Sequence, residues 1–162
     1  MTHAHIALVA SWLTRADITR WLDFGRGRQH LPGPALAIMV QQDAHRLWLV
    51  RDTLSEVVGV VALSDISVPF GTAVLWYAIG VVEARGHGVA TAAVNAALEE
   101  GFGSLGLHVV QAWVVDGNVA SIRVLERAGF RFGGRQRASH VLDGERRDRL
   151  LYDRLRDDTG AP

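Results

Sequence analysis

A short glycine-rich segment has the residue types of an anion-binding turn. Val81 and Val82 precede Arg85-Gly86-His87-Gly88-Val89-Ala90, which lies between an apolar stretch and a long alanine-rich stretch. At a strand-to-helix junction the unpaired N–H groups of the helix start point at one spot, where the helix end favours negative charge. Glycine lets the backbone approach closely, and Arg85 can add charge-assisted hydrogen bonds. The segment therefore suits a pyrophosphate, although a plain strand-to-helix turn explains it equally well on its own.

A second segment, from Asn118 to Phe130, places a capping residue before an amphipathic stretch. Its sequence is Asn-Val-Ala-Ser-Ile-Arg-Val-Leu-Glu-Arg-Ala-Gly-Phe. Asn118 is a favoured N-cap residue, and Ser121 lies one turn into the predicted helix, on a nearby face. Ordinary capping explains either residue alone, so the information lies in the order of the two segments.

The remaining pattern predicts the elements that hold these segments. Strands are expected at Ile6–Ala10, Arg46–Arg51, Val57–Leu63, Ala73–Val82 and His108–Val115, from Phe130, and around the turn Asp143-Gly144; helices are expected at Asp17–Phe24, Pro34–Gln42, Val89–Phe102 and Val119–Ala128. This interleaving predicts one α/β domain, residues 1–156, with a mixed, mostly antiparallel central sheet flanked by helices. Residues 157–162 are expected to form a flexible tail.

Composition argues against several classes of protein. The chain has no cysteine, which excludes disulfides, thiolate zinc sites and a cysteine nucleophile. Its seven histidines are scattered, so no metal site is expected. The formal net charge is zero, which gives no support for a nucleic-acid or membrane surface. No apolar run reaches the ~20 residues that span a bilayer, and no secretory signal is visible. We therefore expect a cytoplasmic protein with no nucleic-acid and no membrane partner.

Taken together, the two segments resemble the GNAT superfamily of N-acetyltransferases. The family motif Arg/Gln-x-x-Gly-x-Gly/Ala binds the pyrophosphate of coenzyme A, and Arg85 to Ala90 match it. A later helix with Asn-x-x-Ser/Ala, ending in Gly-Phe, packs beside the pantetheine arm in that family, and Asn118, Ser121 and Gly129-Phe130 match it. The Asn-x-x-Ser form is most similar to the branch that contains ribosomal-protein N-terminal acetyltransferases. The resemblance covers roughly residues 57–155.

The resemblance implies a GNAT-like fold, acetyl-CoA as cofactor and a primary amine as acceptor. The residues expected to bind the cofactor are Val81, Val82, Arg85, Gly86, His87, Gly88, Val89, Ala90, Asn118 and Ser121. Many relatives carry a tyrosine where this chain has Leu125, as the acid that protonates the leaving thiolate, and Ser121 is the implied substitute. From the residues, Asp65 is the candidate base, although a turn cap is the more ordinary role for it. Backbone N–H groups near Val81 are candidates for holding the oxyanion.

The sequence leaves the acceptor and two alternatives open. Trp21, Phe24 and the loop around Arg26 suggest a pocket for a small amine or a peptide N-terminus rather than a polybasic tail. The absent tyrosine would equally suit a non-catalytic acyl-CoA-binding or sensing module. Ten arginines against seven acids from Ser121 onward would suit a nucleic-acid-binding surface. The assembly is expected to be a monomer or a homodimer.

Overall fold

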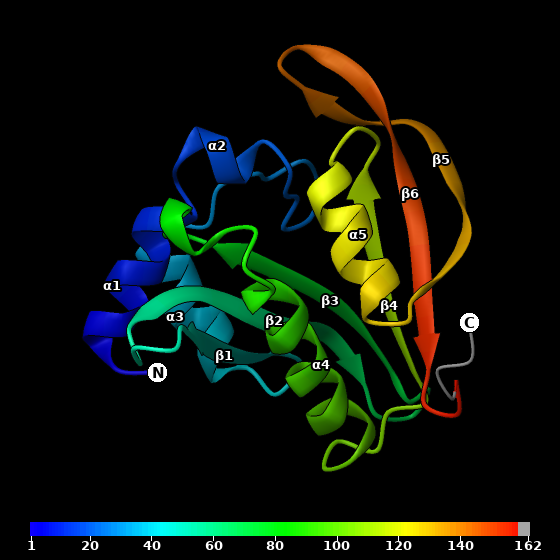
Figure 1. Ribbon diagram of the computed structural model, residues 1–162, viewed down its shortest axis with the longest axis horizontal. Helices are drawn as coiled ribbons and strands as arrows, with labels where there is room; N and C mark the ends of the chain where they lie inside the picture. The colour runs from blue at the N-terminus through cyan, green and yellow to red at the C-terminus, as the bar shows by residue number, and fades with distance from the viewer. Residues whose placement is uncertain (159–162) are drawn as a thin grey trace.

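A single mixed sheet divides the helices into two groups in the computed structural model, which describes residues 1–158 (Figure 1). The strands are β1 (Arg46–Arg51), β2 (Val57–Ser67), β3 (Thr72–Ile79), β4 (Val109–Val115), β5 (Arg131–Leu142) and β6 (Glu145–Leu155). The helices are α1 (His3–Trp12), α2 (Ala16–Thr19), α3 (Gly33–Gln41), α4 (Val89–Phe102) and α5 (Val119–Arg127), with a 3₁₀ turn at Val82–Ala84.

The strands are ordered β1-β2-β3-β4-β6-β5 across the sheet. β3 and β4 are parallel, whereas β1/β2, β2/β3, β4/β6 and β5/β6 are antiparallel. The predicted fold class is therefore confirmed, as is the βαβ-like unit formed by β3, α4 and β4.

The parallel pair at the centre of the sheet is short. β3 and β4 are in register only where Thr72–Val74 lie opposite Val109–Gln111. Beyond these residues β3 stays paired with β2, and β4 stays paired with β6. The sheet therefore consists of two halves that are joined at one end and separate toward the other.

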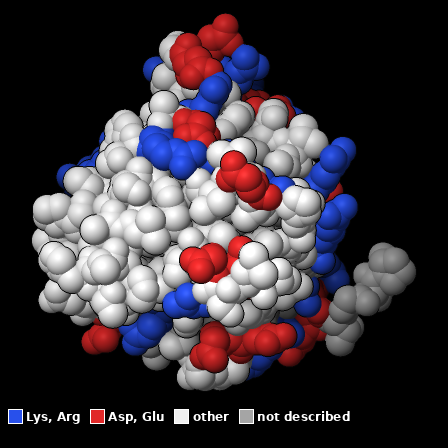
Figure 2. Space-filling view, turned by 60° about the vertical axis from the view of Figure 1, so that its left-hand side comes forward, with Lys and Arg blue, Asp and Glu red and all other residues white. Residues whose placement is uncertain are grey.

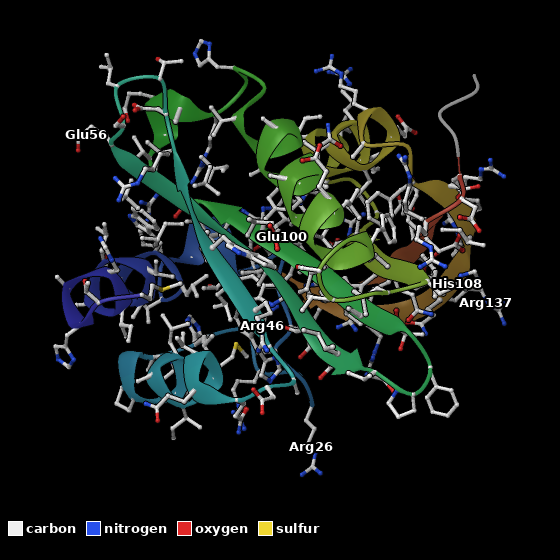
Figure 3. The ribbon with its side chains drawn as sticks, turned by 90° about the horizontal axis from the view of Figure 1, so that it is seen from below. Arg26, Arg46, Glu56, Glu100, His108 and Arg137 are labelled. Carbon is white, nitrogen blue, oxygen red and sulfur yellow. The ribbon has the colours of Figure 1, made fainter. Side chains whose placement is uncertain are left out.

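Each face of the sheet has its own apolar core. Val94 and Leu98 of α4 and Leu125 of α5 pack on one face, against residues such as Leu63. On the other face, helices α1 and α3 pack against β1–β3 and bury Leu36, among others. Viewed from below, α1 and α3 lie on one side of the sheet and α4 and α5 on the other (Figure 3).

The predicted strand at Ile6–Ala10 is wrong, because this segment lies within helix α1. Thr2 and His5 form a reciprocal capping box at its start. The helix buries Val9 and Trp12, three residues apart, against the sheet. A short apolar run does not distinguish a strand from a buried helix, and here the cap and the burial decide for the helix.

Two further elements end well before their predicted ends. The helix expected at Asp17–Phe24 is only the four residues of α2. Beyond it, the Asp23 carboxylate accepts hydrogen bonds from the N–H groups of Gly25 and Gly27, and so favours a turn over helix continuation. The strand expected to end at Val82 ends at Ile79, because the N–H groups of Gly80 and Val81 both donate to the carbonyl of Val58 and the chain then enters the 3₁₀ turn.

The chain end is tied to the sheet. Asp158, assigned by the sequence to the tail, accepts a hydrogen bond from the N–H of Leu155 and pairs with Arg131 at 2.8 Å. Residues 159–162 of the predicted tail lie outside the described residues. Within residues 1–158, none of the helices combines the length and apolar character that a bilayer crossing requires.

Candidate active site

A cavity of about 930 Å³ occupies the gap between the separating strands β3 and β4. Its wall includes Ala90, Asn118 and Ser121 from the side of α4 and α5. It also includes Trp76 and Met39 from the side of α1 and α3. The cavity therefore passes through the sheet, and two molecules that enter from opposite faces can meet inside it.

The start of α4 forms a cradle at one end of this cavity. Gly86 and Gly88 both have left-handed backbone, with φ of 82° and 80°. Nothing lies within 4 Å of where a side chain would begin at either glycine, so the space over them is open. The first backbone N–H to donate within the helix is that of Ala92, to the carbonyl of Gly88, which leaves the preceding amides of the first turn for a ligand. No acidic residue lies in this turn, so its positive end is not neutralised from within.

Arg85 does not extend freely from the cradle. Its Nε donates to the carbonyl of Ile79, and its guanidinium lies 3.0 Å from the Asp17 carboxylate. Arg15 pairs with the same carboxylate at 2.8 Å and also donates to the carbonyl of Gly80. The hydrogen bond from Arg15, with help from Arg85, lowers the pKa of Asp17 to about 2. This cluster fixes the turn before α4 to the start of α2.

Two hydroxyl groups meet on the α5 side of the cavity. The Asn118 side chain accepts from the backbone N–H of Ser121, which confirms Asn118 as the N-cap. The Tyr77 hydroxyl of β3 lies 3.0 Å from Oγ of Ser121. Burial raises the pKa of Tyr77 to about 12, although its hydrogen bond with Ser121 works in the opposite direction. Leu125 is only 1% exposed and belongs to the core.

The opposite end of the cavity has aromatic walls. Phe24 meets Trp76 edge to face, with ring centroids 5.2 Å apart, and Trp21 and Met39 line the same region. Nε1 of Trp76 donates to Oγ of Ser64 at 2.8 Å, which holds the indole in place. Arg26 borders the cavity with an exposed side chain that points away from the body of the protein (Figure 3). This end suits an apolar or aromatic group that carries one polar function.

Asp65 and His45 add titratable groups to this end. Asp65 has left-handed backbone, with φ of 51°, where the pairing of β2 with β3 shifts register. His45 lines the same cavity, and its Nδ1 is buried without a hydrogen-bond partner. Burial lowers the pKa of His45, and the nearby Asp65 carboxylate opposes this shift. His45 is therefore mostly neutral at pH 7, which is the form that accepts a proton.

An ionic network joins the α2 loop to β6 at the edge of the cavity. Arg149 pairs with Asp23 at 2.7 Å and stacks over the ring of Trp113 at 4.1 Å. His140 is 3% exposed, and its Nε2 donates to the carbonyl of Arg20 at 2.8 Å, so its Nδ1 can accept from Arg149 at 3.3 Å. Burial would raise the pKa of Asp23, but hydrogen bonds from Arg149, Gly25 and Gly27 outweigh it and lower that pKa.

A family model described as an acetyltransferase (GNAT) domain matches residues 1–131. The chain belongs to the GNAT acetyltransferase family.

Individual relatives agree with this GNAT assignment. Residues of the chain are 38% identical over 60 positions to a probable N-acetyltransferase, YjcK, of Bacillus subtilis (strain 168); the match covers 37% of this chain and 33% of that relative's length. A spermidine N-acetyltransferase from Vibrio cholerae, solved with CoA and spermine, has a TM-score of 0.83 at 20% identity, over 96% of this chain and 92% of that one. A ribosomal-protein-S5-alanine acetyltransferase from Vibrio fischeri has a TM-score of 0.78 at 21% identity, over 98% and 91%. The two structures share the GNAT fold with this chain.

The GNAT cavity brings together most of the residues singled out in the sequence. Its wall contains Arg85, Gly86, Gly88, Ala90, Asn118, Ser121 and Asp65. It does not contain Val81, Val82, His87 or Val89. The side chains of His87 and Val89 line a separate groove between β1 and α4, and Val82 is exposed in the 3₁₀ turn. The N–H of Val81 is bonded to Val58, so it is not a free oxyanion donor.

Several residues of this GNAT cavity are absent from the predicted site. From the sequence Tyr77 could line the site, but an aromatic residue in a central strand more often packs in the core, and His45 is one of seven scattered histidines. Arg123 and Arg127 of α5 also line the cavity. Strand alternation places Tyr77 on the face of β3 that α5 covers. The missing signal was the separation of β3 from β4, which turns part of that face into a cavity wall. Among residues 1–158, no cluster of potential ligands for a metal ion occurs.

Proposed function

We propose that this chain is an acetyl-CoA-dependent N-acetyltransferase, in which a primary amine attacks the thioester directly. The observation that carries the proposal is the cavity that passes through the sheet, from the open cradle at α4 to the aromatic end. A cofactor held on one face then presents its acetyl group to an amine that enters from the other face. The spermidine enzyme from Vibrio cholerae, which has the same fold, was solved with CoA and spermine together.

The residues present fit coenzyme A. Gly86 and Gly88 leave room over the unpaired amides of α4 for the pyrophosphate, as the motif predicts. Asn118 and Ser121 border the path beyond it toward the aromatic end. Arg123 and Arg127 are exposed arginines on the cavity wall and suit a further phosphate. Arg85, held by Asp17, supports the turn rather than the phosphate directly.

The chain supplies groups for each part of the reaction. Asp65 and His45 are placed at the acceptor end to take the proton from the amine, directly or through water. The N–H of Gly80 points toward β2. Because successive N–H groups of a strand point to opposite edges, the N–H of Ile79 faces the gap between β3 and β4. It therefore replaces the N–H of Val81 as the candidate oxyanion donor. Ser121 is placed to donate a hydrogen bond to the departing sulfur.

The acceptor is proposed to be a small amine or a peptide N-terminus. The aromatic walls formed by Phe24 and Trp76 suit the body of such a molecule, and Asp65 suits its ammonium group. Acidic residues and arginines are interspersed on the face shown in Figure 2, around a broad uncharged area. This mixture of charges favours such an acceptor over nucleic acid. We take the protein to be a cytoplasmic monomer or homodimer. Size-exclusion chromatography with light scattering tests the oligomeric state.

The test is turnover of acetyl-CoA with pooled amines, peptides and cell extract, with acetylated products identified by mass spectrometry. Release of CoA can be followed with a thiol reagent, because the protein has no cysteine and contributes no background. Acetylation of a primary amine supports the proposal. Tight CoA binding without turnover of any amine would establish the non-catalytic module instead. Salt-dependent RNA binding without CoA binding would establish a nucleic-acid-binding protein.

A further inference from the structure

We propose that Tyr77 is a positioning residue for departure of the thiolate, acting through Ser121. The inference rests on the proposed function. Tyr77 comes from β3 and Ser121 from α5, and their hydroxyl groups lie 3.0 Å apart on the wall of the cavity. The two residues thereby connect β3 to α5 across the cavity, at the place where the thioester must pass.

The Tyr77 hydroxyl donates to Oγ of Ser121, and it keeps its proton through the reaction. Burial raises the pKa of Tyr77 to about 12, whereas a thiol such as that of CoA has a pKa of roughly 8.5. The phenol is therefore the weaker acid and keeps its proton while the sulfur leaves. It acts as a fixed hydrogen-bond donor and not as the acid that protonates sulfur.

A count of donors then shows what Ser121 does. A serine hydroxyl has one hydrogen to donate and two lone pairs that accept. The phenol hydrogen of Tyr77 occupies one lone pair of Oγ, so the hydrogen of Ser121 is directed elsewhere. The backbone N–H of Ser121 is already held by the Asn118 side chain, which fixes the start of the helix. Ser121 is half-buried on the cavity wall, and its O–H is left to point at the sulfur.

The reaction step balances without a proton from Tyr77. The amine nitrogen forms a bond to the carbonyl carbon, and its proton goes to the base at the acceptor end. The carbon–sulfur bond then breaks, and its electron pair stays on sulfur. Ser121 donates a hydrogen bond to that developing charge, and the bond from Tyr77 strengthens Ser121 as a donor.

Hydroxylamine with acetyl-CoA tests the proposal, because this acceptor is uncharged at neutral pH and need not lose a proton before it attacks. Ser121→Ala is expected to lower kcat roughly 10- to 100-fold, as for a bond to a charged group, and Tyr77→Phe roughly 5- to 10-fold, as for a neutral one. The variant with both changes should match Ser121→Ala, because Tyr77 acts only through Oγ. Tyr152→Phe is the control: it removes the other buried phenol, which lies outside the cavity. Its kcat should equal that of the wild type.

A binding measurement tests Tyr77 without turnover. Calorimetry compares CoA with desulfo-CoA across pH, in the wild type and in Tyr77→Phe. A hydrogen bond to sulfur favours the bound thiolate, so the preference for CoA should grow with pH in the wild type, and less so in Tyr77→Phe. Equal pH dependence in both proteins, or multiplicative loss of kcat in the double variant, would overturn the role of Tyr77. A wild type that shows this preference but turns over no amine would overturn the proposed function and, with it, the role of Tyr77 in thiolate departure, and would leave only the hydrogen bond to sulfur supported.

Discussion

Gly80 follows β3 and packs against Trp12 of helix α1. A methyl group at Gly80 should therefore destabilise the packing of α1 on the end of β3. A Cβ atom built at Gly80 lands within the indole ring of Trp12, against Cγ, Cδ2 and Cε2. Trp12 is 6% exposed, so it has no free space into which to rotate. Restoring ordinary carbon contacts requires Trp12 to move by roughly 1.5 Å, and α1 must move with it. That shift strains the bond from Arg15 to the Gly80 carbonyl as well.

Gly80→Ala should therefore lie in the upper part of the overpacking range, at about 2–3 kcal/mol lost from the free energy of unfolding. For a chain of this size that corresponds to a Tm lower by roughly 4–12 °C. Urea unfolding and thermal melting followed by circular dichroism measure both quantities. Gly134→Ala in β5 is the matched control, because nothing lies within 4 Å of its added carbon, and it should change stability by less than about 0.5 kcal/mol. If both variants have the same Tm as the wild type, the packing of Trp12 on Gly80 does not contribute as described.

Three more predictions concern the cofactor, the base and pH. Gly88→Ala should weaken CoA binding in calorimetry, because alanine disfavours the left-handed conformation of the cradle by about 1–2 kcal/mol and shifts the free turn away from it. Gly106→Ala carries the same strain outside the cavity and should leave CoA affinity intact; equal losses would refute the cradle. His45→Gln should slow acetylation of benzylamine by about 10²-fold and leave the hydroxylamine rate nearly unchanged, whereas equal slowing would remove His45 as base. Burial lowers the pKa of His140, so the folded protein binds fewer protons than the unfolded chain. Its contribution to stability is therefore present at pH 7 and above and is lost as pH falls below the ordinary histidine pKa of about 6.5. Urea titrations should show this loss in the wild type and a smaller one in His140→Gln, and equal slopes would exclude His140 as its source.

The sequence was most informative where local chemistry decides the structure. Val89–Phe102 was predicted with its observed bounds, because the glycines before it and after it leave little choice of ends. Asn118 was predicted as a cap and caps α5. The segment Ile6–Ala10 failed because its apolar run fits a strand or a buried helix equally, and the capping box that decides the matter uses a histidine, which the usual pattern does not include.

The candidate site shows a different limit. The sequence identified one side of the cavity through its two motifs, but the acceptor end depends on contacts between distant segments. His45 precedes β1, Asp65 lies near the end of β2 and Phe24 lies in the loop after α2, so no spacing along the chain connects them. Tyr77 was correctly placed in a strand, yet its hydroxyl has a functional neighbour only because α5 passes over the gap.

The short pairing of β3 with β4 affects how long the protein resists proteolysis in the cell. Beyond Val74 and Gln111 the two strands no longer pair with each other, and the amides of a bound pantetheine chain can pair with their inner edges as a substitute strand. A ligand that binds only the folded chain stabilises it by RT ln(1 + [L]/Kd), which is about 2.7 kcal/mol when the ligand is at 100 times its Kd. Protease digestion in the presence and absence of CoA would then report a gain in lifetime. The abundance of the protein would follow the supply of acetyl-CoA, even with synthesis held constant.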